Sequence, residues 1–157
     1  MSYQCQILPE HQLGHLCFSG ELRATTFIEG LQTLYGDVAW RPGFSALWDF
    51  SLITSLLVLP DDMDDMVEAV HAISSRMGHG RAVFIVSRVL DEEIAKLLLA
   101  RTRNPERQRH ICYTHAAALA WLELPKTLSG ELVLPCNKQK SGFLARKPLT
   151  KRIHMIR

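Results

Sequence analysis

Residues 44–50 read Phe-Ser-Ala-Leu-Trp-Asp-Phe, and this nearly continuous apolar run decides the fold class. A strand with apolar side chains on both faces is typical of a parallel sheet that is covered by helices on each side. After it, apolar residues recur at spacings of three and four from Pro60 to Met77, and Gly78 follows. That spacing predicts an amphipathic helix, for which Pro60 is a favourable first residue and Gly78 a favourable stop. Together the two segments indicate a strand–helix unit of an α/β protein.

Further strands and helices are predicted on both sides of this unit. Two short apolar runs over 3–8 and 13–18 predict a hairpin with a Pro-led turn. Thr26 and Glu29 have the spacing of a capping box, which predicts a helix that ends near Gly36. The remaining predicted elements are a strand over 81–86, a helix capped by Asp91 that ends before Asn104, a strand over 110–113, and a helix over 116–124 capped by Thr114.

The predicted order of elements is β-β-α-β-α-β-α-β-α. Strands that alternate with helices imply parallel pairing, because each crossover returns the chain in the same direction. We therefore expect an α/β fold with a mainly parallel sheet, in which the first hairpin supplies an antiparallel edge. Neither an internal repeat nor a low-complexity segment is visible in the sequence.

Composition divides the chain at Pro125. The 157 residues are 47% hydrophobic and 22% charged, values that exclude a wholly disordered chain. Residues 126–157 hold 8 lysines and arginines against one acidic residue, Glu131, whereas residues 1–125 hold 10 basic and 15 acidic residues. We expect an α/β domain over 1–125, followed by a basic, poorly ordered extension over 126–157. Such an extension suits contact with an anionic surface, a nucleic acid or an acidic partner.

The cysteines, the apolar runs and the first residues indicate the cellular compartment in which the protein is expected. Four cysteines without short regular spacing do not form a disulfide scaffold, and no apolar run approaches the roughly 20 residues of a membrane span. The first residues, Met-Ser-Tyr-Gln-Cys-Gln, lack the features of a secretion signal. We expect a cytoplasmic protein.

Three segments carry a resemblance to a known family. They are Arg41-Pro42-Gly43-Phe44 leading into Leu47-Trp48-Asp49-Phe50, the strand Arg81-Ala82-Val83-Phe84-Ile85-Val86-Ser87, and the stretch Tyr113-Thr114-His115-Ala116-Ala117-Ala118-Leu119-Ala120-Trp121-Leu122. In order and spacing they resemble the SpoIIAA-like fold of STAS domains, and in particular small stand-alone bacterial STAS-like proteins. The resemblance covers roughly residues 3–124 and excludes the basic extension.

The resemblance implies a non-catalytic interaction or regulatory module with a protein partner. A homodimer is a further option. Lipid-transfer-type domains are grouped with the same family, so the alternative is a domain that binds a small apolar or anionic ligand. No cofactor is implied.

The sequence departs from the family at one functional position. Antagonists of anti-sigma factors carry a phosphorylated serine in an Asp-Ser-Ser/Thr-Gly stretch before the second helix, where this chain has Leu56-Leu57-Val58-Leu59-Pro60. Ser55 lies nearby in a different context. The first turn of the helix already holds Asp61, Asp62, Asp64 and Asp65, which would repel an added phosphate. A phosphorylation switch of that kind is not expected.

The candidate binding residues follow from topology. In an open parallel sheet, ligands and partners bind beyond the carboxyl ends of the strands. The polar residues predicted at that edge are Asp49, Ser51, Ser87, Arg88, Thr114 and His115. Simple structural roles are also available, since Asp49 suits a turn cap and Thr114 a helix cap. If the side chains of Asp49 and Ser87 are solvated, their replacement by Ala changes the free energy of unfolding by less than roughly 1 kcal/mol.

Metal and enzyme chemistry are not expected from the sequence. None of the seven histidines lies in a paired ligand motif. His11, His15, Cys5 and Cys17 share the predicted hairpin, where a packed pair of thiols is favoured over a metal site. For a hydrolase, Ser87 would need one of His79 or His115 and an orienting Asp49, but the residues around Ser87 do not form a nucleophile elbow.

Overall fold

The structure, a computed structural model, describes residues 2–104 and 106–132. Its sheet has five strands in the order β1-β2-β3-β4-β5. The strands are β1 (Ser2–Leu8), β2 (Leu13–Arg23), β3 (Ser45–Leu57), β4 (Ala82–Ile85) and β5 (Arg109–Cys112). β1 is antiparallel to β2, and β2 through β5 are parallel. The predicted α/β class, the mainly parallel sheet and the antiparallel edge hairpin are confirmed.

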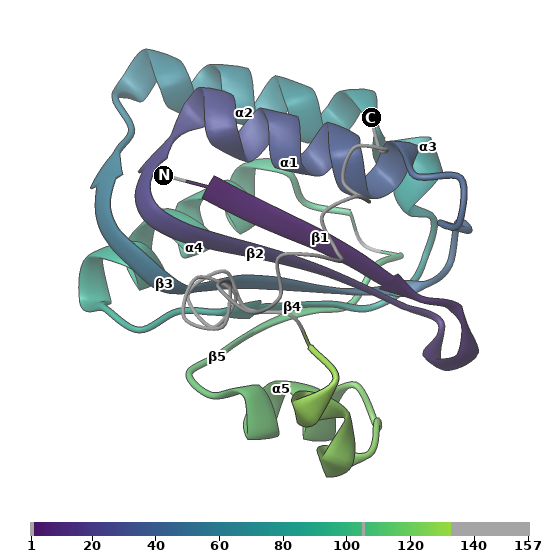
Figure 1. The fold of residues 1–157 in the computed structure, drawn as a ribbon. Helices are drawn as coiled ribbons and strands as arrows, with labels where there is room; N and C mark the ends of the chain where they lie inside the picture. Colours follow the sequence, from purple (N-terminus) through teal and green to yellow (C-terminus); the bar gives the residue numbers. More distant parts are fainter. Residues whose placement is uncertain (1, 105, 133–157) are drawn as a thin grey trace, which may run out of the picture.

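Helices cover both faces of the sheet (Figure 1). α1 (Ala24–Gly36), α2 (Pro60–Ala72), the short α3 (Ser74–Met77) and α4 (Val89–Arg101) pack on one face, and α5 (His115–Trp121) packs on the other. Two 3-10 turns complete the elements, η1 (Pro9–His11) between the first strands and η2 (Lys126–Gly130) after α5. None of the helices within the described residues is long and apolar enough to cross a membrane.

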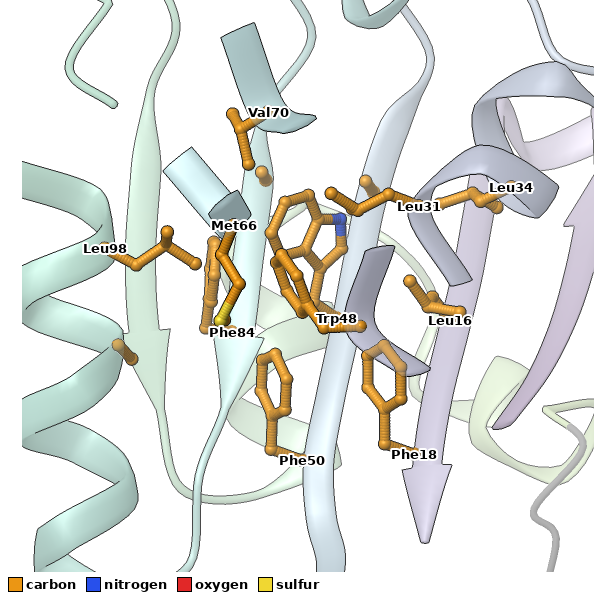
Figure 2. Packing of buried hydrophobic residues seen from close by; sticks show 14 of the residues in the cluster. Leu16, Phe18, Leu31, Leu34, Trp48, Phe50, Met66, Val70, Phe84 and Leu98 are labelled. Atoms are coloured by element: carbon orange, nitrogen blue, oxygen red, sulfur yellow. The ribbon is translucent and has the colours of Figure 1, made fainter. Parts of the chain in front are cut away.

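The apolar run at residues 44–50 works as a two-sided strand. Successive side chains point to opposite faces of a strand, so Trp48 and Phe50 face α1 and α2 while Leu47 and Asp49 face α5. Figure 2 shows Trp48 and Phe50 grouped with Phe18 of β2 and Phe84 of β4. The ring centroids of Trp48 and Phe84 are 4.6 Å apart. This face is a packed aromatic core.

One buried polar contact ties that core to α1. The indole Nε1–H of Trp48 donates to the hydroxyl oxygen of Tyr35 over 3.0 Å. Burial raises the pKa of Tyr35 above its usual range, so the hydroxyl stays neutral. Because the indole N–H has a partner, Trp48 can be buried without an unsatisfied donor.

Several predicted boundaries shift, each for a local reason. β2 passes directly into α1, so Thr26 lies inside the helix instead of capping it. The predicted helix up to Met77 divides at Ile73, which leaves helical geometry, into α2 and α3. α4 begins at Val89, which places Asp91 in its first turn instead of at its cap. The Thr114 cap is confirmed, because its Oγ1 accepts the Ala117 N–H at 3.0 Å.

β3 is also longer than the apolar run suggested. It continues to Leu57 and pairs with β2 along this length. β4 pairs only with residues 46–49 of β3. The second half of β3 therefore projects beyond β4 and reaches the start of α2 at Pro60.

The residues after the expected boundary at Pro125 pack on the domain. Within η2, Leu128 is only 1% exposed, and Leu132 is also buried. Both join the apolar cluster between α5 and the sheet, with Leu119 and Val83 among its members. The packed body therefore extends at least to Leu132. The rest of the expected extension, residues 133–157, lies outside the described residues.

The burial of Leu128 predicts a measurable loss of stability. Leu128→Ala removes a buried side chain and leaves space in the α5 cluster, so we expect the free energy of unfolding to fall by about 2–4 kcal/mol. Urea unfolding followed by circular dichroism measures the change. The neighbouring exposed Ser129 gives a matched control, since Ser129→Ala should change the value by less than about 0.5 kcal/mol. Equal stability of both variants would show that η2 contributes nothing to the body.

Candidate functional site

The carboxyl ends of β2 to β5 lie at one edge of the sheet, on the left of Figure 1. Six predicted site residues come from three neighbouring strands at this edge. β3 carries Asp49 and Ser51, β4 is followed by Ser87 and Arg88, and β5 is followed by Thr114 and His115. Ser51 and His115 bind Asp49 directly, whereas Arg88 and Thr114 bind backbone groups elsewhere at this edge.

Asp49 is the centre of the arrangement, and it is completely buried at 0% exposure. Its Oδ1 accepts hydrogen bonds from the backbone N–H of Ser51 at 3.0 Å and from the Ser51 hydroxyl at 2.6 Å. Its Oδ2 lies 2.6 Å from Nε2 of His115. The expectation that Asp49 could be solvated is wrong, because β3 continues past it and α5 covers its face of the sheet.

The charges of this pair follow from its contacts. Burial by itself would raise the pKa of Asp49, but the hydrogen bonds from His115 and Ser51 and the nearby His15 outweigh it and hold the pKa well below its usual range. The hydrogen bond to Asp49 raises the pKa of His115, against an opposing effect of burial. His115 is 28% exposed on its side chain, so the ion pair has one buried and one partly solvated partner.

Two residues of β2 complete the polar environment of Asp49. Nε2 of His15 lies 3.6 Å from Asp49 Oδ2, beyond hydrogen-bond distance, and His15 is 1% exposed. Cys17 is directly opposite Asp49 in the β2–β3 register. The sequence places both residues in the first hairpin as possible metal ligands, but it does not indicate that they lie beside Asp49. Their alternate positions, 15 and 17, put them on one face, but only the strand register shows which residue they meet.

The four possible metal-binding residues of the hairpin do not come together as one group. Cys5 pairs with Leu16 and Cys17 with Gln4, so the two thiols lie on opposite faces of the hairpin. The Cys5 thiol is 3.8 Å from the carbonyl oxygen of Gly30 in α1. The favoured alternative, a packed pair of thiols, is therefore also wrong.

Ser87 and Arg88 join β3 through its backbone. The Ser87 hydroxyl donates to the Ser51 carbonyl oxygen over 3.4 Å, and Arg88 Nη1 donates to the Thr54 carbonyl oxygen over 2.8 Å. Arg88 also binds the buried Asp91 through two hydrogen bonds of 2.8 and 2.9 Å. Asp91 was not among the predicted site residues. Its ion pair holds Arg88 at the start of α4, and the hydrogen bond from Arg88 to Thr54 links this end of α4 to β3.

The arrangement does not supply the parts of a hydrolase. In the described part of the chain, Ser87 makes no hydrogen bond to a histidine, and the hydroxyl that Asp49 binds belongs to Ser51. His79 precedes β4 at the opposite edge, where its Nδ1 lies 3.2 Å from Glu106. Nucleophilic catalysis needs the hydroxyl beside the base, and here the carboxylate lies between them.

Two hollows in the described part of the chain bear on the ligand-binding alternative. An apolar interior space beside Phe27, Phe50 and Phe84 measures about 20 Å³, close to the volume needed for one water. A larger, open hollow of about 360 Å³ lies between α2 and α4, with Leu59 and Leu97 among its walls. An enclosed apolar cavity of ligand size, which the ligand-binding alternative requires, is not present in either place.

Comparisons with protein-family models and with curated proteins find no match. Among solved structures, this chain is similar to an uncharacterized protein of the DUF3478 family with a SpoIIAA-like fold from Shewanella loihica PV-4. The two are 15% identical with a TM-score of 0.52, and the match covers 77% of this chain and 92% of that one. The chain has the SpoIIAA-like fold. The expected fold is thereby confirmed.

A second similar structure is that of the anti-sigma factor antagonist SpoIIAA in its unphosphorylated form. It is 11% identical with a TM-score of 0.46, and the match covers 78% of this chain and 98% of that one. Within the SpoIIAA-like fold of the present chain, the segment before α2 is the end of β3 and Leu59, without a hydroxyl side chain from Leu56 to Pro60.

Burial of Asp49 predicts that its replacement is costly. Asp49→Ala removes the acceptor of the Ser51 hydroxyl and the partner of His115, so we expect the free energy of unfolding to fall by about 2–3 kcal/mol. Ser87→Ala, on the same edge but exposed, should stay within about 0.5 kcal/mol of the wild type. Chemical denaturation of both variants measures the difference. Equal stabilities would show that the contacts of Asp49 with Ser51 and His115 do not stabilise the fold.

Proposed function

We propose that this protein is a non-catalytic STAS-type interaction module that binds a partner protein at the carboxyl edge of its sheet. The polar residues of that edge, Asp49, Ser51, Ser87, Arg88, Thr114 and His115, belong to the proposed binding face. They hold its loops in place more than they recognise the partner, because most of their hydrogen bonds are internal. The contact itself is assigned to apolar side chains around them.

The distribution of exposed apolar residues carries this proposal. Among the described residues, seven large hydrophobic side chains are exposed, and six of them lie at this edge or on the adjoining helix α4. They are Leu57, Leu59, Val89, Leu90, Leu97 and Tyr113, and we call them the edge patch. The seventh, Val38, lies at the other end, in the connection between α1 and β3. Apolar side chains gathered in one region of a surface indicate an interaction site, whereas scattered ones need no explanation.

The edge patch includes a hollow that can receive a side chain. Leu59 and Leu97 line the open space of about 360 Å³ between α2 and α4. At its rim, Arg101 Nη2 binds Asp64 Oδ1 over 2.7 Å, which links the two helices. Anchor residues at protein interfaces fill pockets of this kind.

Charge around the edge patch defines the partner further. Asp61 and Asp65 are exposed on the first turns of α2, next to Leu59. Residues 1–125 as a whole carry more acidic than basic residues, 15 against 10. The partner that fits is a protein segment with an apolar anchor flanked by Lys or Arg. The basic residues of 126–157, for which the sequence suggests contact with an anionic surface, are a separate proposal.

Regulation by phosphorylation before α2 is not part of the proposal. Asp62 Oδ2 accepts the Leu59 N–H over 2.9 Å and so already caps the helix with a carboxylate. Ser55, the nearest hydroxyl, is partly buried within β3. A phosphate added there would meet the carboxylates of α2 instead of an unpaired helix end.

The test removes the apolar contacts and keeps the fold. Leu59→Ser combined with Leu97→Ser should leave stability nearly unchanged, because both side chains are exposed. A partner captured from the native cell by the wild-type protein is identified and purified, and its affinity is measured by calorimetry. We expect the double variant to bind it at least tenfold more weakly, since the apolar anchor loses its pocket.

Val38→Ser is the control, because it removes an even more exposed apolar side chain away from the edge patch. It should bind the partner as the wild type does. Loss of binding in Val38→Ser with full binding by the double variant would contradict the proposal. Sedimentation of the three proteins shows in parallel whether the bound partner is a second copy of this chain.

A further inference from the structure

Three buried side chains with metal-binding atoms meet beneath α5, and His115 at the start of α5 contacts one of them, Asp49. We call these four residues the inner polar cluster: His15, Cys17, Asp49 and His115. The ring nitrogen of His15, the Sγ of Cys17 and a carboxylate oxygen of Asp49 all lie within 4.8 Å of one another, and all three residues are buried. His115 Nε2 lies 2.6 Å from Asp49 Oδ2 on the α5 side. The donors come from two strands and a helix, each fixed by the fold.

One of these ligand atoms, His15 Nε2, has no hydrogen-bond partner among the described residues. Nε2 of His15 is buried and makes no hydrogen bond within the described residues, although it lies 3.6 Å from Asp49 Oδ2. The Oε1 of Gln4 is buried without a partner as well, and Gln4 is directly opposite Cys17 in the β1–β2 register, on the same face. Leaving a buried polar group unpaired is unfavourable. The two unpaired atoms lie within the inner polar cluster (His15) and beside it (Gln4).

We propose that the inner polar cluster is a binding site for a divalent transition-metal ion, with Zn²⁺ the best match. Imidazole nitrogen, thiolate and carboxylate are the ligands that zinc takes in proteins, usually four in a tetrahedron. The mixed nitrogen, oxygen and sulfur set does not suit Ca²⁺ or Mg²⁺, which require oxygen ligands. The ion gives His15 Nε2 the partner that residues 2–104 and 106–132 do not supply.

The spacing of the donors is compatible with this ion. Bonds of about 2.0–2.3 Å to zinc put neighbouring ligand atoms roughly 3.3–3.6 Å apart. The His15–Asp49 separation of 3.6 Å already has this value. The His115–Asp49 contact of 2.6 Å is a hydrogen bond and must lengthen by about 1 Å. His115 is the partly exposed member, at the start of α5, and can make that movement.

The surroundings of Asp49 favour one orientation of its carboxylate. Both the backbone N–H and the hydroxyl of Ser51 bind Oδ1, which leaves Oδ2 directed at the two histidines. Hydrogen bonds of this type hold a ligating carboxylate in position and are worth roughly 10–100-fold in metal affinity. Ser51 is therefore assigned as a positioning residue. Binding the ion displaces the protons of His115 and of the Cys17 thiol into solvent.

The sequence could not indicate this site. Its ligands lie at positions 15, 17, 49 and 115, without the short paired spacing on which the expectation of no metal site rested. The register of β2 against β3 and the return of α5 over the sheet bring them together. The proposal is independent of the proposed partner, because metal binding is measured on the protein alone.

The experiment uses the full-length protein without an affinity tag, freed of metals with a chelator. Zn²⁺ binding is measured by calorimetry and elemental analysis after desalting, and Co²⁺ serves as the spectroscopic probe. We expect one tightly bound equivalent. We also expect the visible bands of tetrahedral Co²⁺ and a thiolate-to-metal charge-transfer band that Cys17→Ser abolishes. His15→Gln and Asp49→Asn should lose the equivalent, and Ser51→Ala should weaken it roughly 10-fold.

Two matched controls separate this site from ordinary histidine binding. His11 belongs to a different group with Glu10 and Glu131 outside the cluster. His110 lies on β5 and stacks on Trp121, with ring centroids 5.1 Å apart. His11→Gln and His110→Gln should therefore bind as the wild type does.

Loss of the equivalent in His11→Gln, its retention in His15→Gln, or the absence of a tight equivalent in the wild type would overturn the proposal. Thermal midpoints in chelator show which variants remain folded. Cys17→Ser changes a single atom of a buried side chain, so its Co²⁺ spectrum decides the matter even where the other variants do not fold.

Discussion

The negative charge of the buried Asp49 carboxylate must be balanced by hydrogen bonds or a positive charge in direct contact with it. This requirement determines the arrangement of the α5 side of the protein. An uncompensated charge at this depth would cost several kcal/mol. Ser51 supplies two hydrogen bonds from the same strand, and His115 supplies an ion pair from the start of α5. α5 has only seven residues, too few to be stable as an isolated helix. It is held by Asp49 at its first residue and by the burial of Ala118 and Leu119 along its length.

The alternation of β3 keeps this polar chemistry apart from the main core. Trp48 and Phe50 belong to the aromatic face under α1 and α2, and Asp49 between them faces α5. The two faces can therefore have different roles. One supplies the apolar packing that stabilises the fold. The other contains His15 Nε2, a buried polar atom without a hydrogen-bond partner among the described residues. Unfavourable local features of this kind occur mainly at functional sites.

Much of the fold could be predicted from local patterns, and the candidate site only in part. The apolar run at 44–50, Pro60 at the start of a helix and the Thr114 cap each act through neighbouring residues, which is why they indicated the right elements. The convergence of Asp49 with His115 followed from topology. The burial of Asp49 did not, because a single Asp in an apolar strand is also typical of a strand end. The meeting of His15 with Asp49 depends on a register between strands separated by a whole helix, about which a local pattern holds no information.

The length of β3 also affects how the protein behaves toward copies of itself. Beyond Asp49, this strand has β2 on one side and lacks β4 on the other. A bare strand flank of this kind is a template for pairing with a foreign strand, and so for fibrillar aggregation. Here the Ser87 hydroxyl and the Arg88 guanidinium bind the carbonyl oxygens of Ser51 and Thr54 along that flank. These two carbonyl oxygens are therefore already hydrogen-bonded and are less available to pair with the strand of another molecule.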